Sequence, residues 1–184
     1  MEVHLRHLRR VLEVMRANKL YANIDKCVFA SPEIKVLGCF VSNVGVRADP
    51  EKVKAVAAWP TPRSQKGFRK WLGLASYLHK YSAGYAGLAR PLSELLKKDS
   101  DWRWEYRHQD AFKSIKASLK QAPVLALPGE TKPFSVVCDA SDYAIGCALL
   151  QNDTDGHERV ISFQSSQLKA AERNYPFMTR SCLP

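Results

Sequence analysis

The sequence predicts an α+β protein, with helices in the first two thirds of the chain and strands in the remainder. Up to residue 121, most apolar residues recur at the three- and four-residue spacing of amphipathic helices. After Pro123, short β-branched and apolar runs bounded by turn residues replace that spacing. The change of period near residues 121–133 therefore marks the best boundary between the two parts.

The N-terminal segment is predicted to form one helix followed by short extended pieces. Residues 2–19 are amphipathic, because Leu5, Leu8 and Leu12 recur on one helical face. Extended pieces are expected at residues 25–29 and 34–42. The turn residues Asn43-Val44-Gly45 then predict a hairpin over residues 34–48.

Four helices are predicted in the middle of the chain, over residues 50–59, 64–80, about 85–98 and 107–121. Asp49 and Pro50 suit the start of the first helix, since Asp accepts hydrogen bonds from unpaired backbone N–H groups and Pro fits the first helical position. Pro91 should kink or split the third helix, because proline lacks the N–H that a helix interior requires.

Three strands are predicted in the C-terminal part, at residues 134–138, 144–151 and 159–163. Residues 139–143 separate the first two strands, and Gly156 precedes the third. The segment from Ser166 onward is predicted to begin a helix. This half-sheet should lack cover on one face, since no complete helix follows it.

Composition excludes several classes of protein. The chain has 184 residues, 46% hydrophobic and 25% charged, which is ordinary for a folded domain. No apolar run is long enough to span a membrane, and the N-terminus lacks the apolar stretch of a secretory signal. The five cysteines show no metal-binding spacing, so reduced core thiols and an intracellular protein are expected, in either cytoplasm or nucleus.

Most of the positive charge lies in one segment. The net charge is +10, and residues 50–120 hold 15 Lys and Arg against 6 Asp and Glu, a difference of +9. A local basic field is typical of a polyanion partner, most simply nucleic acid. A solvated basic surface without a partner is the alternative.

The helix predicted at 64–80 carries the most suggestive basic pattern. Its candidate nucleic-acid-binding residues follow helical spacing on one face, with Arg69 beside them: Lys66, Lys70, Gly73, Tyr77 and Lys80. A glycine among lysines lets a helix backbone approach a duplex while the lysines pair with phosphates. The alternatives are a close helix–helix crossing at the glycine and a solvated face for the lysines. Trp59, Trp102 and Trp104 are expected to pack rather than to stack on bases.

Four colinear stretches together resemble the Pol polyprotein of Gypsy-type LTR retrotransposons. They are residues 4–29, 36–62, 68–98 and 111–151, the last followed by 160–176. The resemblance implies the end of a reverse transcriptase palm with a primer-grip-like hairpin at 1–48 and thumb and connection helices at 49–121. Residues 122–184 would be the N-terminal half of an RNase H-like mixed sheet.

The resemblance also implies roles for particular residues. Leu37 and Gly38 match the primer-grip turn, although a glycine that permits a β-bulge would explain Gly38 equally well. Asp139 in VCDAS matches the first carboxylate of the RNase H-like family, and it is a weak metal-ligand candidate. The family's second carboxylate falls on Ser181. The alternative for Asp139 is a purely structural role, in which it caps the turn at the end of a strand.

The parent activities implied are RNA-directed DNA polymerase and RNase H endonuclease, both dependent on Mg²⁺. Each needs two metal ions held by clustered carboxylates. The chain contains no YxDD-type polymerase motif and one matching RNase H carboxylate. We therefore expect a truncated element that is catalytically inactive, binds no Mg²⁺ and at most binds an RNA–DNA hybrid or DNA duplex.

Two other functions remain open at this point. The chain could be a domesticated nucleic-acid-binding module, which salt-dependent duplex binding would indicate. It could instead be a protein-interaction module, which capture of a partner in the presence of nuclease would indicate. Other Pol segments are possible partners, no membrane is expected, and the sequence leaves the oligomeric state undecided.

Overall fold

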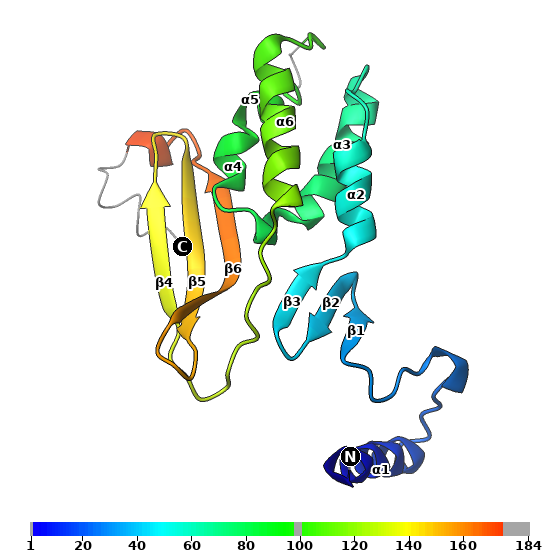
Figure 1. Ribbon diagram of the computed structural model, residues 1–184. Coiled ribbons are helices and arrows are strands. Elements are labelled where there is room, and N and C mark those ends of the chain that lie inside the picture. Colours follow the sequence, from blue (N-terminus) through cyan, green and yellow to red (C-terminus); the bar gives the residue numbers. More distant parts are fainter. Residues whose placement is uncertain (1, 98–100, 175–184) are drawn as a thin grey trace. The chain divides into compact units, whose positions relative to one another are not determined.

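The computed structural model describes residues 2–97 and 101–174, and the chain forms two compact units, Met1–Ile34 and Lys35–Pro184. The first unit holds helix α1 (Glu2–Ala17) and the short helix η1 (Ile24–Lys26) (Figure 1). The helix predicted at 2–19 is confirmed. The extended piece predicted at 25–29 is wrong at its start, because the Asn23 side chain accepts a hydrogen bond from Asp25 N and closes a turn.

The segment predicted to be one hairpin forms a sheet of three strands, ordered β1-β2-β3. The strands are β1 (Glu33–Val36), β2 (Cys39–Ser42) and β3 (Gly45–Ala48). Leu37 and Gly38 adopt left-handed φ angles of 48° and 74°, which turn the chain between β1 and β2. The predicted extended piece at 34–42 is therefore split at these two residues.

Five α-helices follow within the described residues: α2 (Pro50–Ala58), α3 (Gln65–Tyr77), α4 (Tyr85–Leu88), α5 (Arg90–Glu94) and α6 (Tyr106–Lys120). Asp49 caps α2 as predicted, and its carboxylate accepts from Glu51 N at 3.0 Å. The third predicted helix is split into α4 and α5, with Pro91 in the first turn of α5. None of the described helices is both long enough and apolar enough to cross a membrane.

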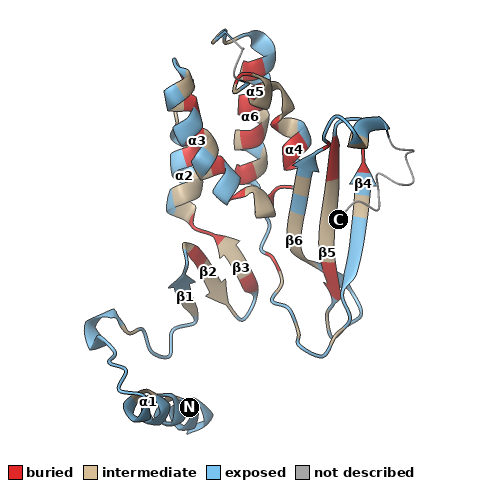
Figure 2. Cartoon of the chain, turned by 180° about the vertical axis from the view of Figure 1, so that it is seen from behind, coloured by how far each residue is buried: buried red, intermediate tan, exposed pale blue. Residues whose placement is uncertain are grey.

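The main core lies among the helices of the second unit (Figure 2). Its largest fully buried side chains include Phe68 and Trp71 from α3 and Phe112 from α6. The Trp71 and Phe112 ring centroids lie 4.5 Å apart, a distance typical of stabilising aromatic pairs. Trp102 and Trp104 pack on Phe68 with centroid distances of 6.0 and 6.1 Å, so the predicted packing role is confirmed for both.

A second antiparallel sheet, ordered β4-β5-β6, forms the C-terminal part. Its strands are β4 (Ser135–Ala140), β5 (Ala144–Asn152) and β6 (Glu158–Gln167), followed by the short helix η3 (Glu172–Asn174). The helix predicted from Ser166 is wrong at its start, because Ser166 and Gln167 pair with β5 and extend β6. Val136 and Val137 of β4 are both exposed. Neighbouring strand residues point to opposite faces, so within the described residues this edge strand presents an apolar side chain on each face of the sheet.

Helical segments pack along β6 on one side of this sheet (Figure 1). Hydrogen bonds join Gln164 to His79 at 3.0 Å and the Ser165 hydroxyl to Ala86 N at 2.9 Å. The linker before β4 adds backbone pairing, because Leu125 and Val46 exchange hydrogen bonds of 2.8 and 2.7 Å. The second sheet is therefore bound to the helices and to β3 within one compact unit.

One cysteine expectation is wrong. Cys138 and Cys147 form a disulfide between β4 and β5, where a set of reduced thiols was predicted. The antiparallel register places the two residues directly opposite each other, with Cα atoms 4.1 Å apart. A separation of nine residues gives no indication of this pairing until the turn between the strands is known. Cys27 and Cys39 are free thiols.

Candidate nucleic-acid interface

Helix α3 presents a basic, solvent-facing side opposite its buried side. The Ser64 hydroxyl begins the helix by accepting from Gly67 N at 3.2 Å. Apolar residues on one side enter the core, and that packing orients the helix. The residues on the other side are all exposed, as their predicted role requires: Lys66, Arg69, Lys70 and Gly73.

Gly73 leaves the α3 backbone open to solvent. A Cβ built at Gly73 would meet no atom within 4 Å among the described residues. Within the described residues, therefore, no other helix crosses α3 closely at Gly73, and that alternative is wrong. An open glycine that follows Lys66 and Lys70 on this face offers a flat stretch of helix to a large ligand.

The structure brings the Leu37–Gly38 turn to the C-terminal end of α3. The Tyr77 hydroxyl donates a hydrogen bond to the Leu37 carbonyl. The Lys52 Nζ lies 3.9 Å from the centre of the Tyr77 ring, which is a cation–π geometry. Leu37, Gly38 and Tyr77, all predicted to bind nucleic acid, thus form one cluster at the end of the basic helix.

Lys80 lies outside the helix on which its predicted role depended. The helix predicted to reach residue 80 ends at Tyr77, and Lys80 belongs to the short helix η2 (His79–Tyr81). Its Nζ lies 3.4 Å from the Cys39 Sγ. Burial raises the pKa of the Cys39 thiol, but the neighbouring side chains of Tyr81, Tyr77 and Lys80 offset this, so that pKa lies below its usual value. Lys80 therefore has a partner within the protein.

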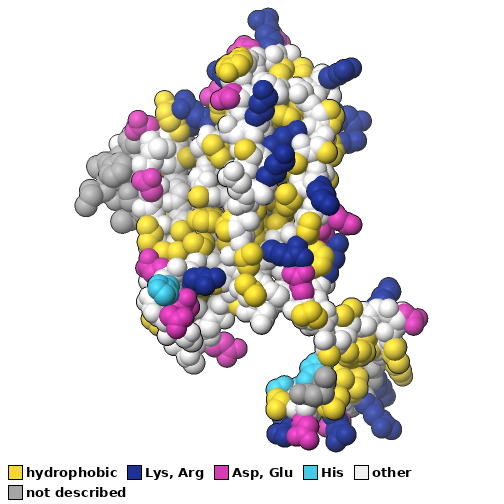
Figure 3. Space-filling view, in the orientation of Figure 1, with side chains coloured by type: hydrophobic (Ala, Val, Ile, Leu, Met, Phe, Trp, Pro, Cys, Tyr) yellow, Lys and Arg dark blue, Asp and Glu magenta, His cyan; other side chains and the backbone are white. Residues whose placement is uncertain are grey.

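Lys and Arg side chains gather over the helical part of the second unit (Figure 3). The sequence places 15 basic and 6 acidic residues at 50–120, and α3 supplies three of the exposed cations described above. The field of these charges would attract a polyanion and would weaken with added salt.

Asp139 lies within β4 and is exposed, with Gly146 opposite it on β5. It does not cap the following turn, contrary to the alternative considered from the sequence. Ser141 does so, because its hydroxyl accepts from Ala144 N at 3.1 Å. A hollow of about 340 Å³ beside Asp139 has mostly small and apolar lining residues. Ser181, the match to the second carboxylate, lies outside the described residues.

Asp139 belongs to no potential metal-binding group in the described part of the chain. The one such group found there is Asp153, Asp155 and His157, in the turn between β5 and β6. The Asp153 carboxylate accepts from the backbone N–H groups of Asp155 and His157, each at 2.9 Å. These hydrogen bonds shape the turn and explain why the three residues lie together.

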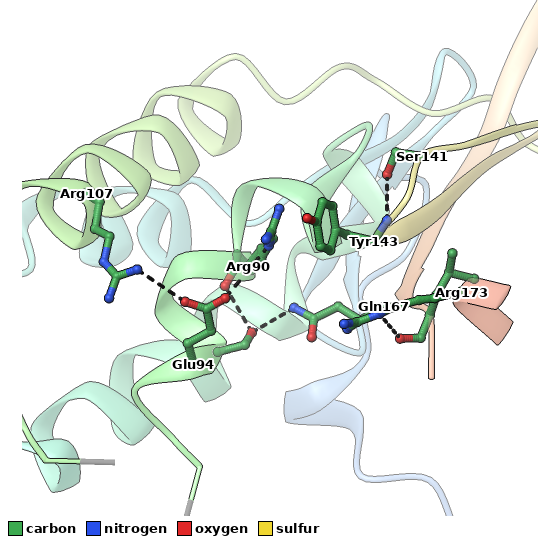
Figure 4. Close-up of polar contacts among 10 residues, drawn as sticks. Arg90, Glu94, Arg107, Ser141, Tyr143, Gln167 and Arg173 are labelled. Carbon is green, nitrogen blue, oxygen red and sulfur yellow. Dashed lines mark hydrogen bonds and ion pairs between the residues drawn. The ribbon is translucent and has the colours of Figure 1, made fainter. Parts of the chain in front are cut away.

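A polar cluster that was not predicted from the sequence joins α5 to the second sheet (Figure 4). The Arg90 guanidinium lies 3.1 Å from the Tyr143 ring centre, so the two groups stack. Gln167 Nε2 donates to Ser93 Oγ at 3.0 Å, and Glu94 forms an ion pair with Arg90 at 3.8 Å. Sequence spacing alone could not reveal the cluster, because its members come from three separate segments.

The C-terminal segment and the overall fold both match known reverse transcriptases. Residues 104–184 match a family described as the RNase H-like domain found in reverse transcriptase. Two solved structures of the foamy viral protease-reverse transcriptase share the fold. One, in complex with double-stranded DNA, has a TM-score of 0.83 at 18% identity and covers 98% of this chain and 32% of that chain. The other, in complex with an RNA/DNA hybrid, has a TM-score of 0.81 at 18% identity. The match covers 99% of this chain and 25% of that chain.

Relatives in sequence narrow the class. The retrovirus-related Pol polyprotein from transposon opus of Drosophila melanogaster is 33% identical over 193 residues, which cover 99% of this chain and 19% of the relative. The transposon Tf2-3 polyprotein of Schizosaccharomyces pombe is 31% identical over 180 residues, which cover 98% of this chain and 14% of the relative. The chain spans less than a fifth of either relative. It belongs to the retrotransposon Pol polyproteins, as a segment that includes the RNase H-like domain found in reverse transcriptase.

Proposed function

We propose that this chain binds a nucleic-acid duplex, either RNA–DNA hybrid or DNA, without sequence preference. The exposed face of α3 and the adjoining Leu37–Gly38 turn would form the contact surface. The observation that carries this proposal is the open stripe of Lys66, Lys70 and Gly73, which ends at the turn held by Tyr77. The foamy viral structures, which are complexes with double-stranded DNA and with RNA/DNA hybrid, support the choice of ligand.

Phosphate contacts account for the expected lack of sequence preference. Lysine and arginine side chains on a helix pair with the phosphate backbone, which is the same for every sequence. The one amide side chain on α3, that of Gln65, donates to the Leu95 carbonyl at 3.2 Å within the protein. Binding should therefore depend on salt and on duplex geometry.

The salt dependence of binding tests this proposal. A fluorescently labelled RNA–DNA hybrid is titrated with the chain at several salt concentrations, and anisotropy gives the affinity. If roughly four phosphates are neutralised, the logarithm of affinity should fall with the logarithm of salt at a slope of about −3 to −4. Absence of binding at low salt would contradict the proposal, as would binding that salt leaves unchanged.

We propose further that the chain alone catalyses neither DNA synthesis nor hybrid cleavage. Two Mg²⁺ ions about 4 Å apart need several carboxylates between them. Asp139 offers one carboxylate, and the described residues place no second one in a metal-binding group with it. The donor set present therefore does not fit the metal pair of the parent family.

Incubation with a labelled hybrid and either Mg²⁺ or Mn²⁺ tests this second part. We expect no primer extension and no cleavage above a protein-free control. Hybrid cleavage that Asp139→Asn abolishes would refute the proposed inactivity. The Asp139→Asn variant also serves as the control for a contaminating nuclease, since contamination would survive the change.

A further inference from the structure

The turn that carries Leu37 is held in a conformation that its own sequence disfavours. Tight two-residue turns between strands favour Asn-Gly or Asp-Gly, because both residues take positive φ angles. Here the first position is Leu37, with φ 48° and a side chain that is 91% exposed. An apolar side chain in the left-handed region, pointing into solvent, requires contacts from outside the turn to keep it there.

Tyr77 supplies the main contact of this kind. Its hydroxyl donates to the Leu37 carbonyl, and its ring lies against the Lys52 ammonium group. The next residue of the turn is fitted to the same hydroxyl: a Cβ at Gly38 would lie 2.8 Å from it and 2.5 Å from Lys52 Nζ. Both residues of the turn are therefore matched to the position of the tyrosine.

Tyr77 also ends the helix that carries the basic stripe. At 1.5 Å per residue, about 10 Å of helix axis separates Tyr77 from Lys70 and about 16 Å separates it from Lys66. A hydrogen bond from Tyr77 to the turn consequently sets the distance between an exposed apolar side chain and two phosphate-binding groups. An unheld turn would place Leu37 at a variable distance from them.

We infer that Tyr77 is a positioning residue of the duplex-binding surface. It holds the Leu37 side chain where it meets the sugars of the same duplex whose phosphates Lys66 and Lys70 bind. The inference rests on the proposed function. It assigns Tyr77 no direct contact with the ligand, which distinguishes it from the role first predicted from helical spacing.

A double-mutant cycle between Tyr77 and Leu37 tests the inference. Tyr77→Phe removes the hydroxyl and keeps the ring, and Leu37→Ala removes the apolar side chain. Affinity for the labelled hybrid is measured for the full chain, both single variants and the double variant at fixed low salt. Tyr106→Phe, at a tyrosine that is 85% exposed, is the matched control.

We expect Tyr77→Phe to weaken hybrid binding by roughly three- to tenfold, the range of one lost hydrogen bond. The salt slope should stay unchanged, because no cation is removed. In the Leu37→Ala background, Tyr77→Phe should have less than about a twofold further effect, since coupled residues are not additive. If Tyr77→Phe prevents folding, Gly38→Ala, which crowds the same hydroxyl, takes its place with the same expected coupling to Leu37.

Two results would overturn the inference while the proposed function stands. The first is an unchanged affinity for the hybrid in Tyr77→Phe. The second is a double variant whose fold-loss in affinity equals the product of the two single-variant losses. A wild-type chain without salt-dependent binding would overturn the proposed function itself, and the inference with it. An effect of Tyr106→Phe equal to that of Tyr77→Phe would also count against a specific positioning role.

Discussion

Two glycines of the proposed surface lie in opposite local environments. Gly38 has a left-handed φ of 74°, and an added Cβ would come within 3 Å of two side-chain atoms. Gly73 lies in the middle of α3, and an added Cβ would meet nothing within 4 Å. The same substitution should therefore have opposite effects on stability at the two positions.

The prediction is that Gly38→Ala lowers the free energy of unfolding by about 1–2 kcal/mol, the usual cost of a left-handed backbone for a residue with a Cβ. Gly73→Ala should raise it by about 0.5–1 kcal/mol, because alanine favours the helix. Urea denaturation measures both. Equal changes of one sign would show that the local environments described here are wrong. If Gly73→Ala weakens hybrid binding while it raises stability, the loss cannot come from unfolding.

Single residues were the hardest features to predict from the sequence. Helical spacing identified Lys66, Lys70 and Gly73 as one exposed stripe, and the structure has that stripe. The same spacing carried the stripe on to Lys80, although the helix ends at Tyr77. Periodicity assumes that a helix continues, so it cannot reveal a side chain that bonds to a residue 40 positions earlier, as Tyr77 does with Leu37.

At the scale of elements, helix starts were predictable because their signals are local. Asp49 and Ser64 each accept a backbone N–H of the first helical turn, as residues of these types commonly do. Strand ends were less predictable, because a strand continues for as long as a neighbouring strand pairs with it. Pairing with β5 carried β6 through Ser166, where the sequence indicated a helix, and the Leu37–Gly38 turn divided one predicted strand into two.

The first turn of helix α6 contains a buried histidine, His108, that makes the stability of the fold depend on pH. His108 Nδ1 accepts from Glu105 N at 2.9 Å, so Nε2 carries the proton of the neutral ring. Burial lowers the pKa of His108, and the charge of Arg107 lowers it further, against opposing effects of Glu105 and Glu94. His108 is therefore harder to protonate in the folded state than in the unfolded chain, where a histidine is protonated near pH 6.5.

Stability should therefore decrease as pH falls below about 6.5, where the unfolded state binds more protons. The measurement is the urea midpoint between pH 7.5 and 5. His108→Gln should flatten this dependence, since glutamine keeps a capping acceptor at the same helical position and does not titrate. His4→Gln, at an exposed histidine of α1, is the matched control and should leave the dependence unchanged. An unchanged pH dependence in His108→Gln would contradict this account.

At the scale of the whole molecule, charge distribution and fold class were predictable, but assembly was not. The +9 excess at residues 50–120 and the change from helical to strand periodicity follow from composition and order alone. The hydrogen bonds of Gln164, Ser165 and Gln167 that tie β6 to the helices join residues 74 to 85 positions apart. Such contacts depend on the packed fold, so the single compact unit of Lys35–Pro184 could not be derived from the sequence.

The most direct test of the duplex-binding surface compares two double variants of equal charge. Lys66→Ala with Lys70→Ala removes two cations from α3, and Lys113→Ala with Lys120→Ala removes two exposed cations from α6. Anisotropy titration of each against the RNA–DNA hybrid at several salt concentrations gives the salt slope. The α3 variant should weaken binding to all sequences alike and reduce the slope by about 2, while the α6 variant keeps nearly the wild-type slope. Equal slopes for the two variants, or no binding by the wild-type chain, would contradict the assignment of the surface to α3.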